Sequence, residues 1–331
     1  MPNLTNASVD AAQAGREEAR PRPLFVVGSK RSGSTLMANL LNAHPRVFVS
    51  HESDVLWILY QARNGPPARY VRHPLDSELM MDATVRRCRR VLAALGHPPT
   101  HGQIVDAFHG VQERVMDAYF HPPLDQRIKR AVLKAGKDRS PRGLLRAFRE
   151  QSRLPPKRDL AWTGDKKHAQ YLDPELRPFV GEHFPGARYV HVVRDPRGAV
   201  ASVLEAARKW KVMPDYFRGT AAEVLERWAI HEEWALRMKE EVGDAFLTVR
   251  LEDLWREPRA VAHRLLDFLE LETTDEFEAM IPRLIHPRDP NEKYASFTLP
   301  EVPRALRIVE IHGYEAGSLR SGEPAGAGIG D

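Results

Sequence analysis

The chain has 331 residues, of which 42% are hydrophobic, and its 49 Lys and Arg against 45 Asp and Glu give a net charge of +4. This composition allows a sizeable core, and so mild an excess of positive charge argues against generic nucleic-acid binding. The only cysteine, Cys88, excludes an intrachain disulfide and a multi-thiolate metal site. The sequence lacks a secretory signal and an apolar run of about 18 residues. We therefore expect a cytoplasmic protein without a membrane span.

The order of apolar segments indicates alternating strands and helices. Terminal residues 1–21 and 317–331 are expected to be disordered tails around a single domain, residues 22–316. Residues 57–157 read as a helical insertion that covers the sheet edge and shapes a substrate pocket. Strands are predicted over 24–28, 47–51, 160–164, 188–193 and 245–250, and helices over 34–43, 198–210 and 259–269. This alternation predicts an α/β fold with a central parallel sheet and helices on both faces.

A glycine-bracketed turn joins the first strand to the first helix. It reads Gly28-Ser-Lys-Arg-Ser-Gly-Ser-Thr35. Such a turn directs backbone N–H groups and the positive end of a helix dipole at one point, so it binds phosphate. ATP-binding loops end in Gly-Lys-Ser/Thr, but Ser34 stands where their lysine would be. The candidate ligands of a phosphate are Gly28, Lys30, Arg31, Ser32, Gly33, Ser34 and Thr35.

A second motif follows the strand 188–193. Arg194 leaves this apolar strand into a proline-containing turn, and Ser202 lies over one turn into the helix that follows. A guanidinium there can bind a phosphate in bidentate fashion, and the serine adds a hydroxyl donor. The alternative is that Arg194 pairs with Asp195 or Asp253 as scaffolding and Ser202 is a packing residue.

Together these motifs resemble those of the 3'-phosphoadenosine 5'-phosphosulfate (PAPS)-dependent sulfotransferases, closest to the tyrosylprotein and bacterial small-molecule branch. The segment Gly28–Leu36 is similar to the family's Gly-x-Pro-Arg-Ser-Gly-Thr-Thr-Leu, and Leu41-Asn-Ala-His-Pro45 to the segment that follows it. Arg194 and Ser202 match the residues that hold the 3'-phosphate in that family. Leu251-Glu-Asp-Leu254 is similar to the family's Tyr-Glu-Asp-Leu, with leucine replacing an aromatic residue. The resemblance implies a P-loop-NTPase-like three-layer fold and PAPS as co-substrate.

The resemblance also suggests the residues that carry the chemistry. Glu52 falls where the tyrosylprotein branch has its catalytic base, and a Glu52–arginine ion pair is the alternative. His51 is the second candidate for the base. Lys166 resembles the lysine that contacts the sulfonate, with Lys167 as an equally charged neighbour. The catalytic residues are therefore predicted to be Glu52, Arg31 and Lys166.

These residues predict a transfer of sulfonate from PAPS to a hydroxyl, or less readily an amine, with release of 3'-phosphoadenosine 5'-phosphate (PAP) and no metal. The partner is a small-molecule or peptide acceptor, and a homodimer is left open. The segment Asp289–Ser296 is a candidate for a loop over the cofactor. Two rivals are a small-molecule kinase that uses ATP and magnesium and a non-catalytic nucleotide-binding module. The first lacks the lysine of ATP-binding loops, and the second has no need of Glu52 or Lys166.

Overall fold

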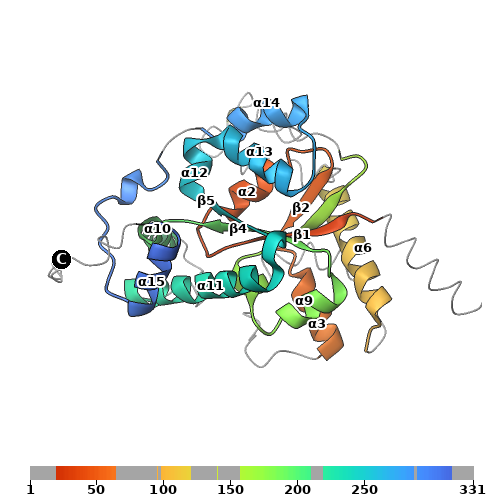
Figure 1. Cartoon of the computed structure of the whole chain (residues 1–331), viewed down its shortest axis with the longest axis horizontal. Coiled ribbons are helices and arrows are strands. Elements are labelled where there is room, and N and C mark those ends of the chain that lie inside the picture. The colour runs from red at the N-terminus through yellow and green to blue at the C-terminus, as the bar shows by residue number, and fades with distance from the viewer. Residues whose placement is uncertain are drawn as a thin grey trace, which may run out of the picture.

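The computed structural model describes residues 20–64, 95, 98–120, 140, 157–209, 219–286 and 289–314. A five-stranded, entirely parallel sheet lies at its centre, in the order β2-β3-β1-β4-β5. The strands are β1 (Arg22–Val27), β2 (Val47–His51), β3 (Trp162–Lys166), β4 (Arg188–Val193) and β5 (Phe246–Arg250). The predicted α/β class is confirmed, with helices on both faces of the sheet (Figure 1).

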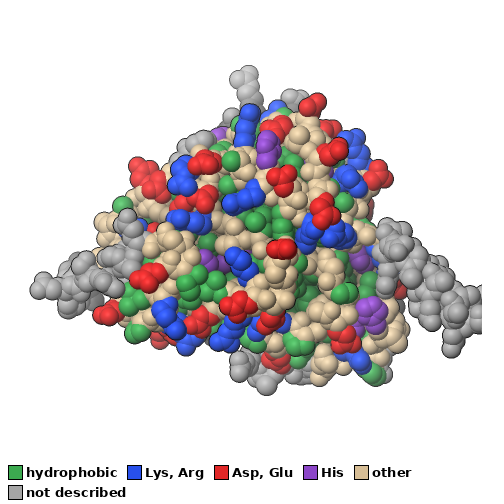
Figure 2. All heavy atoms as spheres, viewed as in Figure 1, with side chains coloured by type: hydrophobic (Ala, Val, Ile, Leu, Met, Phe, Trp, Pro, Cys, Tyr) green, Lys and Arg blue, Asp and Glu red, His purple; other side chains and the backbone are tan. Residues whose placement is uncertain are grey.

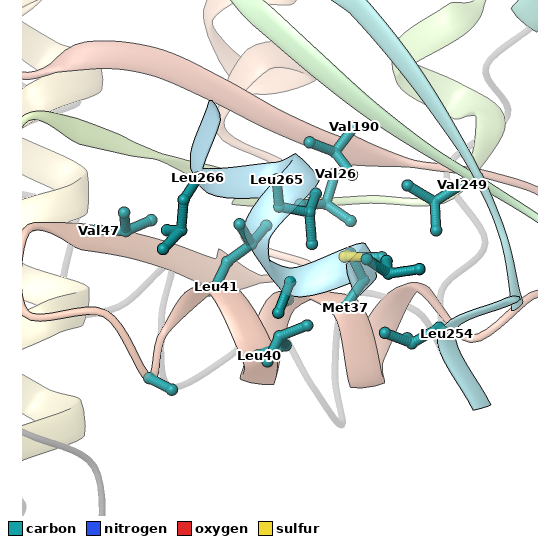
Figure 3. Close-up of a cluster of buried hydrophobic side chains, with 14 of the residues drawn as sticks. Val26, Met37, Leu40, Leu41, Val47, Val190, Val249, Leu254, Leu265 and Leu266 are labelled. Atoms are coloured by element: carbon teal, nitrogen blue, oxygen red, sulfur yellow. The ribbon is translucent and has the colours of Figure 1, made fainter. Parts of the chain in front are cut away.

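One face of the sheet is covered by four helices: α2 (Ser34–Leu41), α12 (Leu251–Arg256), α13 (Pro258–Phe268) and α14 (Asp275–Leu284). Successive strand side chains point to opposite faces, so Leu24 and Val26 of β1 face these helices. Figure 3 shows this core, where Met37 and Leu41 of α2 meet Val190, Val249 and Leu265. The burial of these side chains holds α2 against the sheet, so the N-terminus of α2 lies next to the end of β1.

The opposite face is covered by helices from distant parts of the chain. Phe25 and Val27 of β1 face this second core, where Phe25 meets the rings of Phe108 and Tyr171 edge-on. A third cluster joins α10 and α15 to α11 (Figure 1). The elements concerned are α3 (Val55–Asn64), α6 (His101–Phe120), η2 (Ala169–Leu172), α9 (Arg177–His183), α10 (Pro196–Lys209), α11 (Ala221–Val242), η4 (Gly243–Ala245) and α15 (Pro303–Ile311), with η5 (Glu292–Tyr294) beside α10.

Several predicted boundaries were wrong by one or two residues. The strand expected at 160–164 lies at Trp162–Lys166, so Lys166 belongs to the strand and is buried. The helix expected from Gly198 begins at Pro196, because proline is well suited to a first helical turn. In the predicted insertion, α3 and α6 are helical as expected and α6 contacts β2 and β3. Most of the rest of residues 57–157 and nearly all of both predicted tails lie outside the described residues.

The surface is mixed in charge. Lysine and arginine side chains alternate with aspartate and glutamate across the face shown in Figure 2. Within the described segments, no helix combines the length and the apolar character needed to cross a bilayer.

Candidate active site

The predicted phosphate loop connects β1 to α2 and requires glycine at both ends. Gly28 has a φ of 151°, and a Cβ there would lie 2.3 Å from the Val192 carbonyl oxygen of β4. Gly33 has a φ of 98°, and a Cβ there would lie 2.5 Å from Cδ1 of Leu251. Both positions combine a left-handed backbone with a close neighbour, so a side chain would displace the loop. Leu251 therefore packs against Gly33, a contact that the sequence did not suggest.

The loop presents polar groups that suit a phosphate. Gly33 is the N-cap of α2 and makes no side-chain capping bond, so the first N–H groups of the helix are available to a ligand. Ser32 is fully buried, and its Oγ has no hydrogen-bond partner in the described part of the chain. A buried hydroxyl without a partner beside a helix start fits an anion that the loop would hold.

The second motif meets the loop through Arg31. Its Nε donates a hydrogen bond to Ser202 Oγ at 3.0 Å, and its backbone oxygen accepts one from Arg194 Nη1 at 3.1 Å. Arg194 and Ser202, predicted to hold the 3'-phosphate, thus lie beside Arg31 of the loop, although 163 and 171 positions separate them from it. Within the described segments, Arg194 forms no ion pair with Asp195 or Asp253; Asp195 pairs with Arg197 and Asp253 with Arg256.

Glu52 and Lys166 meet at the carboxyl ends of two neighbouring strands. Glu52 N donates to the Lys166 carbonyl at 2.8 Å, and the two side chains form an ion pair. His168 Nε2 lies 3.4 Å from the same carboxylate oxygen, Oε1. Burial alone would raise the pKa of Glu52, but His168 and Lys166 outweigh it and lower the pKa to about 2. Glu52 is therefore ionised at neutral pH, with Oε1 engaged.

A buried aspartate that the sequence reasoning missed fixes the turn of Glu52. Asp165 Oδ1 accepts a hydrogen bond from Ser50 Oγ at 2.7 Å, and Oδ2 accepts one from Tyr171 OH at 2.6 Å. The backbone N–H of Ser53 lies 3.1 Å from Oδ2. These bonds surround Glu52, which has a φ of 54°. An aspartate directly before the candidate lysine, at the end of a predicted buried strand, is the sequence signal that could have identified Asp165.

The structure distinguishes the two candidate lysines by their partners. Lys166 pairs with Glu52, whereas Lys167 pairs with Asp54. Burial raises the pKa of Asp54, and the Lys167 charge opposes that rise. His51, the second candidate for the base, lies opposite Lys166 in the β2–β3 register. Burial and then Lys166 lower its pKa to about 4, so His51 is neutral at pH 7.

The site therefore consists of two groups of residues at the carboxyl ends of the parallel strands. One contains Glu52, Lys166 and His168, and the other contains Arg31, Arg194 and Ser202. Of the five described non-glycine residues with positive φ, three (Arg31, Glu52 and Asp54) lie in these groups or next to them. Such a backbone costs energy and is typical of functional sites. The arrangement can hold two anionic groups beside an ionised carboxylate.

The class of protein is defined by comparison with known families. A model of the sulfotransferase family matches residues 23–275 of the chain. This match includes the loop, both motifs and the Glu52–Lys166 pair. The chain belongs to the sulfotransferase family.

Individual relatives agree with this assignment. Carbohydrate sulfotransferase 6 from Homo sapiens is 26% identical over 304 residues, which cover 85% of this chain and 71% of the human protein. The sulfotransferase domain of the Synechococcus PCC 7002 olefin synthase has 20% sequence identity and a TM-score of 0.51, with 89% of this chain and 96% of that domain covered. At that identity, the second similarity supports the fold alone.

Proposed function

We propose that the protein transfers a sulfonate group from PAPS to a hydroxyl of a small-molecule or peptide acceptor and releases PAP. The observation that carries this proposal is the pairing of Glu52 and Lys166 at the strand ends, at the same edge of the sheet as the glycine loop. Ligands in open parallel sheets bind at this edge. A binding module would need neither a buried lysine nor an ionised carboxylate at this position.

The residues of the loop would hold the 5'-phosphate of PAPS. Gly28 and Lys30 to Thr35 supply backbone N–H groups, hydroxyls and positive charge. The buried Oγ of Ser32 would gain the hydrogen-bond partner that it lacks among the described residues. Arg194 and Ser202 would bind the 3'-phosphate. Arg31 remains a candidate for stabilising the transferring group, but its contact with Ser202 favours a role at the 3'-phosphate.

PAPS would supply the sulfonate. The protein would remove the proton of the acceptor hydroxyl and stabilise the negative charge on the leaving phosphate. Glu52 would accept the proton of the acceptor hydroxyl on Oε2, because Lys166 and His168 both engage Oε1. Lys166 would stabilise negative charge on the leaving phosphate. As the Lys166 charge is drawn toward that phosphate, the pKa of Glu52 would rise, which makes the carboxylate a better base during transfer.

The acceptor is expected to bind in a pocket shaped by the predicted insertion 57–157. Among hydroxyl acceptors we place saccharides first for testing, because the human relative is named as a carbohydrate sulfotransferase. Phenols and peptides follow, since the family resemblance is also to the tyrosylprotein branch.

Thermal-shift measurements with PAP, ATP plus magnesium, and AMP test the donor. We expect PAP to stabilise the protein most, because it alone carries phosphates at both the 5' and 3' positions. Turnover of sulfur-labelled PAPS with a panel of acceptors then tests transfer. A larger shift with ATP and magnesium would favour the kinase, and PAP binding without any turnover would favour the non-catalytic module.

A further inference from the structure

The segment Asp289–Tyr294, here called the strap, lies against the Arg194 side chain. Asn291 Oδ1 accepts a hydrogen bond from Arg194 Nε at 2.9 Å, and the Pro290 carbonyl accepts one from Nη2 at 2.6 Å. The Tyr294 ring lies beneath the guanidinium, with 5.6 Å between the arginine Cζ and the ring centroid. The strap therefore holds one edge and one face of the guanidinium.

Asn291 is itself held on its other side by Glu252. Asn291 Nδ2 donates to Glu252 Oε1 at 2.7 Å, and the same oxygen accepts a hydrogen bond from Asp195 N at 3.0 Å. Tyr314 OH donates to Oε2 at 2.8 Å. Each end of the Asn291 amide thus has a partner of the right kind, which fixes its orientation. The Glu252 carboxylate connects the strap to the residue that follows Arg194.

The absence of a side chain at position 198 makes room for this contact. A Cβ on Gly198 would lie 1.8 Å from Asn291 Oδ1 and 2.8 Å from Arg194 Nε. Asn291 therefore occupies the space that Gly198 leaves beside Arg194. Three distant segments, around 194–198, at 252 and at 291, converge on one guanidinium.

In the described part of the chain, the hydrogen bonds of Arg194 use three of the five N–H groups of its guanidinium, and two remain for a ligand. We propose that Asn291 is a positioning residue that orients Arg194 toward the 3'-phosphate and so sets the preference for 3'-phosphorylated nucleotides. This inference rests on the proposed function, which assigns the 3'-phosphate to Arg194. An arginine already held in its binding conformation loses less side-chain entropy when the phosphate arrives.

Calorimetry with PAP and AMP on Asn291→Ala tests the inference. PAP affinity should fall about 10-fold because Arg194 loses an oriented, charge-assisted contact, whereas AMP affinity should change less than about 2-fold. AMP binding also reports that the variant is folded. Lys293→Ala is the matched control, because Lys293 lies in the same strap but pairs with Glu205 of α10. Gly198→Ala should reproduce the selective PAP loss, since the new methyl group would displace the Asn291 side chain.

A double-mutant cycle with Arg194→Ala decides whether Asn291 acts through Arg194. In the Arg194→Ala background, Asn291→Ala should cost less than about a further 2-fold in PAP affinity, because the group that it positions is gone. Independent losses in the two backgrounds, or equal losses of PAP and AMP, would overturn the inference. If Arg194→Ala selectively weakens PAP but Asn291→Ala does not, only the positioning role fails. If Arg194→Ala weakens PAP and AMP equally, the assignment of the 3'-phosphate to Arg194 fails as well.

Discussion

Two carboxylates near the phosphate loop differ in their burial and in their partners. Glu52 follows the carboxyl end of β2, where its side chain is 25% exposed and pairs with Lys166. Glu232 lies within α11 with a fully buried side chain, where Oε2 is 3.0 Å from His191 Nε2 and 3.2 Å from His312 Nε2. Ser29 Oγ of the loop donates to its other oxygen at 2.6 Å.

Both carboxylates stay ionised for the same reason. Burial would raise the pKa of Glu232, but His191 and His312 hold it well below its usual range. Charge alone therefore does not separate a reacting group from a structural one. The two carboxylates differ in their position in the fold. Glu52 lies at the strand ends on a left-handed backbone, whereas Glu232 lies in the interior of a long regular helix. We infer that Glu52 serves chemistry and Glu232 serves the loop and the fold.

The largest expected effect is on turnover in Glu52→Gln. Removing a general base lowers kcat by roughly 10² to 10⁴, whereas calorimetry should show PAP affinity within a few-fold of wild type. The loss should be smaller for a phenol that ionises readily than for an alkyl alcohol.

Asp54→Asn is the matched control for this change, because Asp54 lies in the same turn and pairs with Lys167. Its kcat should stay within a few-fold of wild type. If Glu52→Gln retained more than half of wild-type turnover on an alkyl alcohol, the base would have to be sought elsewhere, and His51→Asn would be measured next.

Glu232→Gln should produce the converse result. Removing the charge of this buried carboxylate costs about 3 kcal/mol in the free energy of unfolding, measured with urea, because His191 and His312 lose the anion that they contact. The change in kcat of the folded enzyme should be small. Glu233→Gln on the next residue of α11 is the control, since its pair with Arg304 is partly exposed and is worth less than about 1 kcal/mol. A large fall in kcat without loss of stability would contradict the division of roles.

A smaller effect is expected on the pH dependence of the free energy of unfolding, to which Glu52 contributes. The pKa of Glu52 is about 2 in the folded protein and about 4.3 in an unfolded chain. A lowered folded pKa stabilises the protein above the unfolded pKa, and this contribution is lost as pH falls toward 2. The stability difference between wild type and Glu52→Gln should therefore be largest near pH 6 and shrink below about pH 4.3. A constant difference from pH 6 to pH 3 in urea unfolding would show that the ion pair does not stabilise the fold.

The sequence predicted the parts of this site that depend on short spacing. Apolar runs located all five strands, and glycines at 28 and 33 located the loop, because both signals lie within a few residues. The strand around Trp162 was placed two residues early because Asp165 and Lys166 look polar. They are buried because partners elsewhere in the chain satisfy them, such as Glu52 for Lys166.

Contacts between distant segments could not be predicted in the same way. The bond of Asn291 to Arg194 joins residues 97 positions apart, and that of Ser29 to Glu232 joins residues 203 apart. Ser29 belongs to the loop motif and Asn291 to the segment Asp289–Ser296, but neither pattern identifies the distant partner. A glycine at position 198 indicates a close approach of another group, but only the structure shows that the Asn291 side chain fills the space beside it.

Ser29→Ala carries the smallest expected effect and tests the comparison most directly, because Ser29 joins the loop to Glu232. The change removes one hydrogen bond to a charged acceptor and should cost about 1.5 to 3 kcal/mol or less in unfolding, since His191 and His312 still contact Glu232. PAP affinity should fall no more than a few-fold, because the loop is also held by Val192 and Leu251 around its glycines. A fall above about 10-fold in calorimetry, with AMP affected equally, would place the buried cluster within the 5'-phosphate site. Glu232 would then act on the cofactor through Ser29, and its assignment to a purely structural role would be wrong.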